Sequence, residues 1–381
     1  MTVGMPRGSI IERARAALTG ARGRAALREW LVPAIFVGIA VIEYSVAGLP
    51  FGFVAGEVMT RIARDSLFTL ALIVPIVAGL GLNFSVVIGA LGGQIGLVVV
   101  NDLGIGGLPG LAIAVLIGVA LGYLGGIAVA WCMERAPGRE MIVGIILGFL
   151  ADGIYRIVFM AGYGTVLPSH NPEMVLSRGI GLRDTVDFAI LRRALDLAIP
   201  VRIGVLIVPV ATLLVVALTA WLLTRLLRSR TGAHLRAVGL DPAGARLAGL
   251  DPARLKRFAL IVSTVVASVG QVVWLQNIGM LQTYTAHRNV GFLAGAALLA
   301  GGATVRNARI RHALVGTAVF HTMFVLSPLA GQALTGSPAI GEFFRSFVTY
   351  GTIAVALVVT GWVEARRSSG DTLDERLDAG P

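Results

Sequence analysis

Residues 228–257, RSRTGAHLRAVGLDPAGARLAGLDPARLKR, form the longest basic interruption in an otherwise hydrophobic chain. They contain a short helix whose two ends are specified by the sequence. Asp241 is a good N-cap because its carboxylate can accept the unpaired N–H groups of the first turn, and Pro242 suits the first helical position. Gly249 can adopt the left-handed conformation that ends a helix. The Asp-Pro pair that follows repeats the start signal, so we predict a short capped helix between two long apolar segments.

This capped helix has two interpretations. It is a rigid lever that carries force into a membrane transporter driven from outside the membrane, or it is an ordinary connecting loop with one helical turn. The spacing alone favours neither of them.

The composition of the 381-residue chain places it in a membrane. Hydrophobic residues make up 56% of it and charged residues 14%, whereas soluble domains have about 45–50% and about 25%. The mean hydropathy is +0.83, and apolar runs of about 20 residues, long enough to span a bilayer, recur along the sequence. The 49 glycines fit this class because small residues let membrane helices approach closely.

The net charge of +11 would suggest a nucleic-acid partner in a soluble protein. Here about 21 of the 32 Lys and Arg residues fall in segments expected on one side of the membrane. The positive-inside rule therefore predicts that both termini are cytoplasmic. We expect the basic surface to contact membrane lipids with anionic headgroups, and we expect no nucleic acid to bind. The basic segments are 1–29, 132–140, 227–257, 304–311 and 363–381.

We predict an all-α, polytopic membrane protein with about ten transmembrane helices. A basic amphipathic segment, 1–29, precedes the transmembrane domain, 30–362, and a tail, 363–381, follows it. Glycines interrupt 66–100, so this region is two short helices or one span with a broken partner. Segment 290–303 is too short for a straight crossing and can be re-entrant only if protein buries it. The expected spans are 30–48, 66–82, 85–100, 109–131, 141–160, 203–226, 258–278, 290–303, 312–329 and 344–362.

The largest segment expected on the outer side is 161–202. Within it, 184–199 has helical apolar spacing, and Asp184 can cap its start. This pattern predicts a helix that lies flat on the outer surface. It is either a docking surface for an extracellular or periplasmic partner or a simple surface helix.

No sequence pattern supports enzymatic chemistry. The only lysine is Lys256, and no Gly-Lys-Ser/Thr phosphate loop occurs, so another chain must hydrolyse any ATP that drives the protein. Cys132 is the single cysteine and cannot form an internal disulfide. We therefore expect no catalytic residue, no metal site and no cofactor, because the histidines are scattered without metal-ligand spacing: His170, His234, His287, His312 and His321.

Polar side chains inside the expected spans need a reason, because a charge at mid-membrane costs roughly 2.5–3.5 kcal/mol. Asp152 and Arg156 are four residues apart and are expected to pair, and Glu43 lies near an outer end and can reach water. Amides can replace the water hydrogen bonds of a neutral polar solute, although hydrogen bonding between helices is the alternative for each. The candidate substrate-path amides are Asn83, Gln94, Gln271, Gln276 and Asn277.

Three parts of the sequence resemble the permeases of ABC importers that serve branched-chain amino acids, ribose-type sugars and nucleosides. Residues 228–270 carry a pattern of the type Arg-Ser-x-x-Gly, Arg-Ala-x-Gly and Ala-x-x-x-Gly-Leu. A second similar stretch is 79–97, GLGLNFSVVIGALGGQIGL, and a third is 291–317, which contains a Gly-Gly pair before the next span.

The resemblance implies an all-α permease in the inner membrane of a bacterium. It implies a pair of identical or homologous permeases, cytoplasmic ABC ATPase subunits, and a periplasmic or lipid-anchored solute-binding protein. It also implies that the capped helix at 241–249 docks on the ATPase. The expected docking residues are Asp241, Pro242, Ala245, Arg246, Leu247 and Gly249.

The expected function is therefore the non-catalytic transmembrane subunit of an ATP-driven importer for a small polar solute. The Arg-Ala-Val-Gly-Leu-Asp-Pro portion favours a sugar or nucleoside, with a branched-chain amino acid next. The alternative is an ion-coupled secondary transporter that works without an ATPase and uses Glu43, Asp152 or His321 as coupling groups. A membrane scaffold or receptor is a third class.

Overall fold

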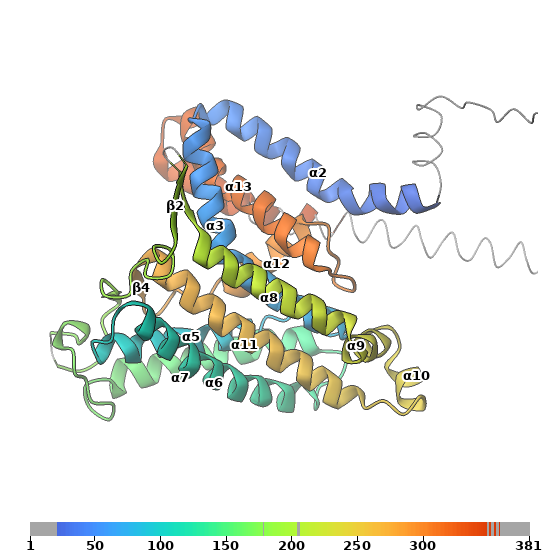
Figure 1. Cartoon of the computed structure of the whole chain (residues 1–381), viewed down its shortest axis with the longest axis horizontal. Helices are drawn as coiled ribbons and strands as arrows, with labels where there is room; N and C mark the ends of the chain where they lie inside the picture. Colours follow the sequence, from blue (N-terminus) through green and yellow to red (C-terminus); the bar gives the residue numbers. More distant parts are fainter. Residues whose placement is uncertain are drawn as a thin grey trace, which may run out of the picture.

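The computed structural model describes residues 21–177, 179–203, 206–348, 350–351, 354–355 and 358, and it consists mainly of helices (Figure 1). The helices are α2 (Ala21–Ala47), α3 (Phe51–Ala71), α4 (Ile73–Val77), α5 (Val86–Asp102), α6 (Gly107–Met133), α7 (Glu140–Ile157) with a π-helical turn (Val158–Gly162), a 3-10 turn (Pro172–Met174), α8 (Val210–Arg228), α9 (Arg230–Leu240), α10 (Pro242–Leu247), α11 (Pro252–Ile278), α12 (Val290–Ala300) and α13 (Ile310–Thr335). Four short strands are β1 (Thr185–Asp187), β2 (Pro200–Ile203), β3 (Leu206–Pro209) and β4 (Met280–Gln282).

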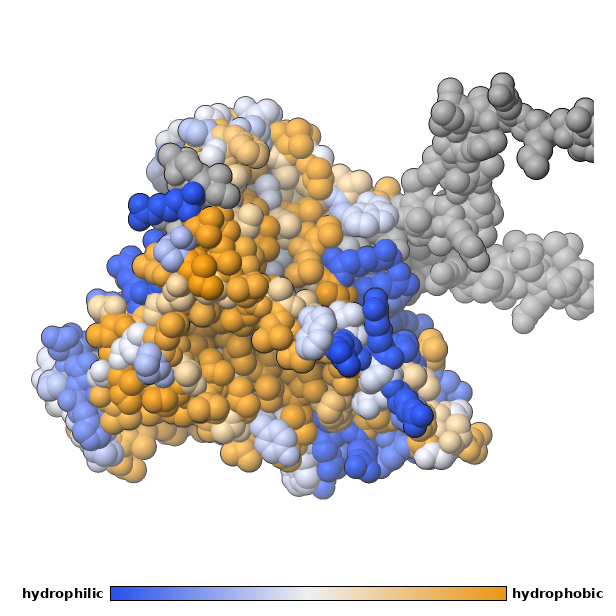
Figure 2. Space-filling view, in the orientation of Figure 1, coloured by the Kyte–Doolittle hydropathy of each residue, from blue (hydrophilic) through white to orange (hydrophobic). Residues whose placement is uncertain are grey.

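The predicted all-α membrane fold is confirmed. The long helix α11 runs between two ends of the molecule: it follows α10 directly, and β4 follows it (Figure 1). We call these the α10 end and the β4 end. A broad hydrophobic surface lies between hydrophilic groups at the two ends (Figure 2). In the described part of the chain, six segments are long and apolar enough to cross a membrane: Trp30–Ala47, Gly107–Met133, Glu140–Gly162, Val210–Arg228, Pro252–Ile278 and Ile310–Thr335.

The second span predicted at 66–82 was wrong at its start, because α3 begins at Phe51. Charges at Arg61, Arg64 and Asp65 in the middle of this helix made the residues before 66 resemble a loop. In the structure these charges are paired. Arg64 Nε donates to Asp65 Oδ2 at 3.1 Å, and Arg61 Nε lies 3.8 Å from the carboxylate of the glutamate four residues earlier. The predicted interruption lies between α4 and α5, where Gly79 and Gly81 have φ values of +78° and +70°.

The helix predicted at 184–199 is not formed. Its first residues form β1, in which Val186 lies opposite Leu281 of β4. Arg193 has a φ of +53°, a left-handed conformation that does not occur inside a right-handed helix. Leu191 is completely buried. Val186, Phe188 and Leu191 are therefore buried where this segment folds against β4, whereas Ile190, Leu197 and Ile199 stay exposed.

The span predicted at 203–226 begins later than expected. Strands β2 and β3 form an antiparallel hairpin in which Val201 lies opposite Val208, and α8 starts only after it. Branched apolar residues favour a strand as well as a membrane helix, so hydropathy alone could not separate the two.

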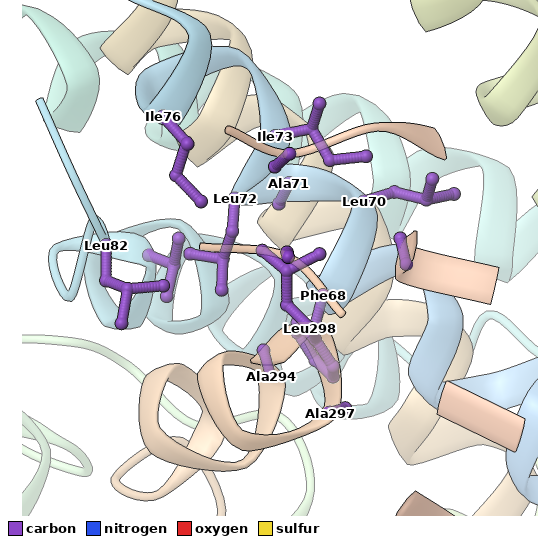
Figure 3. Close-up of a cluster of buried hydrophobic side chains, with 14 of the residues drawn as sticks. Phe68, Leu70, Ala71, Leu72, Ile73, Ile76, Leu82, Ala294, Ala297 and Leu298 are labelled. Carbon is purple, nitrogen blue, oxygen red and sulfur yellow. The ribbon is translucent and has the colours of Figure 1, made fainter. Parts of the chain in front are cut away.

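The segment predicted to be short and buried is α12, which has 11 residues. Most of its side chains are buried, including Ala294, Ala297 and Leu298. Figure 3 shows these residues near Phe68 and Leu72. Protein therefore covers α12, as a helix too short to cross a bilayer requires.

Helices α5, α6 and α11 cross with their backbones in contact. A Cβ atom added to Gly89 would lie 2.2 Å from the carbonyl oxygen of Thr264, and one added to Gly93 would lie 2.2 Å from that of Ser268. A Cβ on Gly96 would lie 2.4 Å from the carbonyl oxygen of the facing residue on α6. No real Cβ atom fits at such distances, so this crossing depends on glycine at all three positions.

The predicted terminal segments fall largely outside the described residues. Of segment 1–29, the structure describes only 21–29, which begin α2. The tail 363–381 lies wholly outside. The last expected span, 344–362, is described in part and is helical at 344–348.

Candidate functional site

The predicted capped helix is present as α10. Asp241 Oδ1 accepts a hydrogen bond from the backbone N–H of Ala243 at 3.0 Å, and Pro242 occupies the start of the helix. Gly249 has a φ of +81°. Asp251 then caps α11 by accepting hydrogen bonds from the next two available backbone N–H groups, at 3.0 and 3.2 Å. The local signals in the sequence therefore predicted both ends of this helix correctly.

The surface of α10 carries large apolar side chains that the described chain leaves uncovered. Leu247 is 92% exposed, and Leu240, at the end of α9, is 87% exposed. Arg246 is exposed between them, whereas Ala245 is buried. These two leucines and the arginine make this exposed surface the candidate for the predicted docking site. Among the predicted docking residues, Arg246 and Leu247 face outward and Ala245 packs inward.

Helix α9 touches α4 through two glycines. A Cβ atom added to Gly79 would lie 2.9 Å from Cα of Gly239, and one added to Gly239 would lie 2.2 Å from the carbonyl oxygen of Val77. Gly79 also has a φ of +78°. Because the two backbones are in direct contact, α9 cannot move toward α4 without displacing the residues that follow α4.

Asn83 holds the segment between α4 and α5 against α11. Its Nδ2 donates to Ser263 Oγ at 3.1 Å, and its Oδ1 accepts from the backbone N–H of Ser85 at 3.1 Å. Asn83 is only 3% exposed. It therefore connects the α9 contact to the start of α5.

A pocket opens where this segment meets α7 and α12. The space in and around it, including the solvent at its open mouth, is about 380 Å³. Two aromatic rings of its wall, those of Phe84 and Phe292, lie 4.9 Å apart between centroids. Asp152 and Arg288 are the charged residues of the lining. The complete lining consists of Phe84, Val87, Ile145, Gly148, Phe149, Asp152, Arg288, Gly291 and Phe292.

Asp152 is the centre of an ionic network at the pocket. Arg156 Nε donates to both carboxylate oxygens at 3.1 Å, which confirms the predicted pair. His287 Nε2 lies 2.8 Å from Asp152 Oδ1, and Arg288 Nε lies 3.8 Å from Asp152 Oδ2. Arg156 also donates to the carbonyl oxygen of Tyr284. This network fixes α7 to the loop before α12, and Arg288, whose side chain is 50% exposed, remains accessible to a solute.

The two other ionisable groups expected in the membrane lie elsewhere. Glu43 was expected to reach water, but it is only 7% exposed. It accepts a hydrogen bond from Ser327 Oγ at 2.7 Å. His321 is 5% exposed, and its Nε2 lies 3.8 Å from Asp65.

The five candidate path amides do not meet in one place. Gln94 and Gln271 are 0% exposed and face each other between α5 and α11, with Gln94 also donating to Tyr155 Oη at 2.7 Å. Gln276 and Asn277 lie at the end of α11. The amides therefore divide into three groups: Gln94 with Gln271 between α5 and α11, Gln276 with Asn277 at the β4 end, and Asn83.

The pair at the β4 end binds Asp196. Gln276 Nε2 donates to Asp196 Oδ1 at 3.1 Å, and Asn277 Nδ2 donates to Asp196 Oδ2 at 2.6 Å. Thr212 Oγ1 donates to the same carboxylate. Asp196 is 5% exposed, so all three donors are satisfied in a protein interior.

We expect Asp196→Ala to lower the free energy of unfolding by at least about 3 kcal/mol, because it leaves three buried donors without a partner and each costs about 1–3 kcal/mol. Thermal unfolding of the purified protein in detergent measures this loss. Asp184→Ala, at an exposed position in the same segment, is the matched control and should change the midpoint little. Equal midpoints for the two variants would contradict the assignment.

Sequence reasoning missed several residues of these sites. Asp196 was part of a predicted surface helix, and His287 was one of five scattered histidines. Phe84, Phe149 and Phe292 come from three distant segments. No sequence signal marks them, because aromatic residues in apolar runs are ordinary.

Comparison with known proteins places these features in a family. Residues 55–357 match the family described as branched-chain amino acid transport system / permease component. The chain belongs to this family. None of the curated proteins and none of the solved structures matches it.

The predicted resemblance to this permease family is thus confirmed, and the chain is a transmembrane permease component. The matched residues include α9, α10, the glycine contact with α4 and every residue of the pocket. Within the described residues, no group of three or more His, Cys, Asp or Glu side chains could hold a metal ion.

Proposed function

We propose that this permease is the transmembrane subunit of an ATP-driven importer and that α10 is the helix that docks on the ATPase. The proposal rests on one observation above the others. A capped helix with a 92% exposed leucine is joined, through the contact of Gly239 with Gly79, to the segment that lines the pocket. The sequence contains no phosphate loop, so ATP hydrolysis is assigned to partner ABC ATPase subunits.

In this proposal the α10 end faces the cytoplasm and the β4 end faces the periplasm of a bacterium. The arginine-rich loops support this orientation through the positive-inside rule. A solute-binding protein then delivers the solute to the β4 end. A second permease, identical or homologous, completes the path.

The pocket favours an amphiphilic solute that has an apolar part and one end with charges of both signs. Its wall is mostly aliphatic and aromatic, and Asp152 and Arg288 supply one charge of each sign. A sugar carries hydroxyl groups on all sides, and each one buried without a hydrogen bond costs about 1–3 kcal/mol. We therefore place a branched-chain amino acid ahead of a sugar or nucleoside, the reverse of the order that the 228–257 stretch favours.

The test is purification of the tagged permease from its native host in mild detergent. We expect mass spectrometry to identify an ABC ATPase with the wild type, with ATPase activity in the sample, and to lose it with Arg246→Glu. Uptake of labelled leucine should then be inhibited by unlabelled valine and far less by ribose or uridine. A permease that purifies alone and takes up solute only with a proton gradient would instead favour the ion-coupled transporter, and inhibition by ribose or uridine alone would refute the solute assignment.

A further inference from the structure

Helix α7 forms one wall of the pocket and is loosely attached along its middle. Six of its large apolar side chains are more than half exposed: Ile142, Ile146, Phe149, Leu150, Ile154 and Ile157. The side that faces the protein presents Gly144 and Gly148. A Cβ atom added to Gly148 would lie 3.8 Å from its nearest neighbours, which is ordinary contact. Val143 and Leu147 pack against the core beside these glycines, and a Cβ on Gly144 would lie 3.1 Å from the flexible end of Met133. The contacts along the middle of α7 are thus apolar, and its polar attachments lie toward its ends.

Ionic contacts hold α7 near both of its ends. Toward the β4 end, Asp152 binds Arg156, from its own helix, and His287 from the loop before α12. At the α10 end, Glu140 is the first residue of α7, and Lys256 Nζ donates to its Oε1 at 3.0 Å. The Glu140 and Lys256 side chains are 15% and 24% exposed, so water screens this pair less than a surface salt bridge.

Lys256 lies close to α10 in the chain. It belongs to the second turn of α11, whose cap, Asp251, follows α10 after a short turn. It is also the only lysine among 32 Lys and Arg residues. Because α10 and the start of α11 are in contact, a displacement of α10 moves Lys256.

The neighbouring residue Arg257 makes a similar bond to another helix. Its Nε and Nη2 donate to the two carboxylate oxygens of Glu134 at 2.9 and 3.0 Å. Glu134 ends α6. Helix α6 already packs along α11 at other positions, where a Cβ on Gly126 would lie 2.8 Å from Cα of Ile261. The Arg257–Glu134 pair is therefore redundant for joining these helices, whereas Lys256–Glu140 is an ionic link from α11 to α7.

We propose that Lys256 and Glu140 are positioning residues whose ion pair transmits the displacement of α10 to α7 and so changes the pocket. This inference rests on the proposed function, in which α10 docks on an ATPase. The Gly239–Gly79 contact is one route from α9 and α10 to the pocket. The Lys256–Glu140 pair is a second route, and it reaches the wall of the pocket that α7 forms.

The test uses the complete transporter in proteoliposomes, with its ATPase and solute-binding protein. We expect Glu140→Gln to lower solute uptake per ATP hydrolysed about tenfold, within the range of typical coupling energies, while the ATPase remains bound. Glu134→Gln removes the same charge at the neighbouring link and should stay within about twofold of the wild type. The double variant Glu140→Lys/Lys256→Glu exchanges the two charges and should restore most of the uptake. A purely structural defect at Glu140 would not be rescued by this exchange.

Normal uptake per ATP in Glu140→Gln, or an equal loss in Glu134→Gln, would overturn the link alone. A wild-type permease that binds no ATPase would overturn the proposed function and the link together, so the two failures are distinguishable.

The single lysine provides a second measurement, which remains available if a variant does not fold. An amine-reactive reagent modifies one side chain in this permease. In the wild type, Lys256 should react slowly both without nucleotide and with the ATPase trapped in its ATP-bound state, because the pair stays closed while it transmits motion. Rapid labelling in the trapped state would overturn the proposal.

Discussion

Leu247→Asp is expected to separate the permease from its ATPase without unfolding it. Leu247 is 92% exposed, so the described chain loses almost no packing when the side chain changes. An apolar residue at the centre of an interface contributes about 2 kcal/mol or more, which is at least roughly 30-fold in the dissociation constant. An aspartate would add the cost of a carboxylate without a partner. Co-purification in detergent and uptake in cells measure the two consequences.

The matched control for this variant is Leu334→Asp. Leu334 is 65% exposed and lies in the last turn of α13, so the same substitution is made at an exposed leucine on another helix. We expect this control to retain the ATPase. Retention of the ATPase by Leu247→Asp would show that α10 is not the docking element.

Gly239→Val is expected to keep the ATPase bound and to abolish the transfer of motion to the pocket. A Cβ at this position would lie 2.2 Å from the carbonyl oxygen of Val77, so α9 has to move away from α4. Overpacking of this kind costs about 1–3 kcal/mol. Because the exposed face of α10 is unchanged, we expect ATP hydrolysis to continue while uptake falls by at least about tenfold.

Gly38→Val controls for the general effect of a branched residue in a membrane helix. Nothing lies within 4 Å of a Cβ atom at Gly38, and we expect normal uptake. If Gly239→Val transports as well as Gly38→Val, motion does not pass from α9 to α4.

The sequence predicted those parts of the structure that depend on neighbouring residues. The ends of α10 are set by Asp241, Pro242 and Gly249, all within nine positions, so their effect does not require the rest of the fold. The long apolar helices follow from composition in the same way. The family pattern around 228–270 then indicated a permease, which the match over residues 55–357 confirmed.

The failures have a different physical cause. The middle of α3 is charged, and Arg64 there donates a hydrogen bond to Asn277 of α11, which is 213 residues away in the sequence. The segment 184–199 has a helical pattern, yet it pairs with β4, which is remote in the sequence. In both cases a distant partner decides the local conformation, and no local pattern contains that partner.

The candidate site illustrates the same limit. The pocket is made by residues near 84, 149 and 292, and no pattern in the sequence shows that these three stretches meet. The Asp152–Arg156 pair was predictable because both residues are on one helix, whereas the contacts of Asp152 with His287 and Arg288 were not.

The glycine crossing of α5, α6 and α11 has an evolutionary consequence. At Gly89, Gly93 and Gly96 the facing group is a backbone carbonyl, which no mutation can make smaller. A larger residue there cannot be compensated by a smaller one opposite, so these positions should show neither variation nor covariation among related permeases. The outward face of α7, with Ile142, Ile146 and Leu150 exposed, should instead exchange freely among apolar residues. Sequence drift in this family is thus expected to be slow at the crossing and fast on the surface that meets lipid.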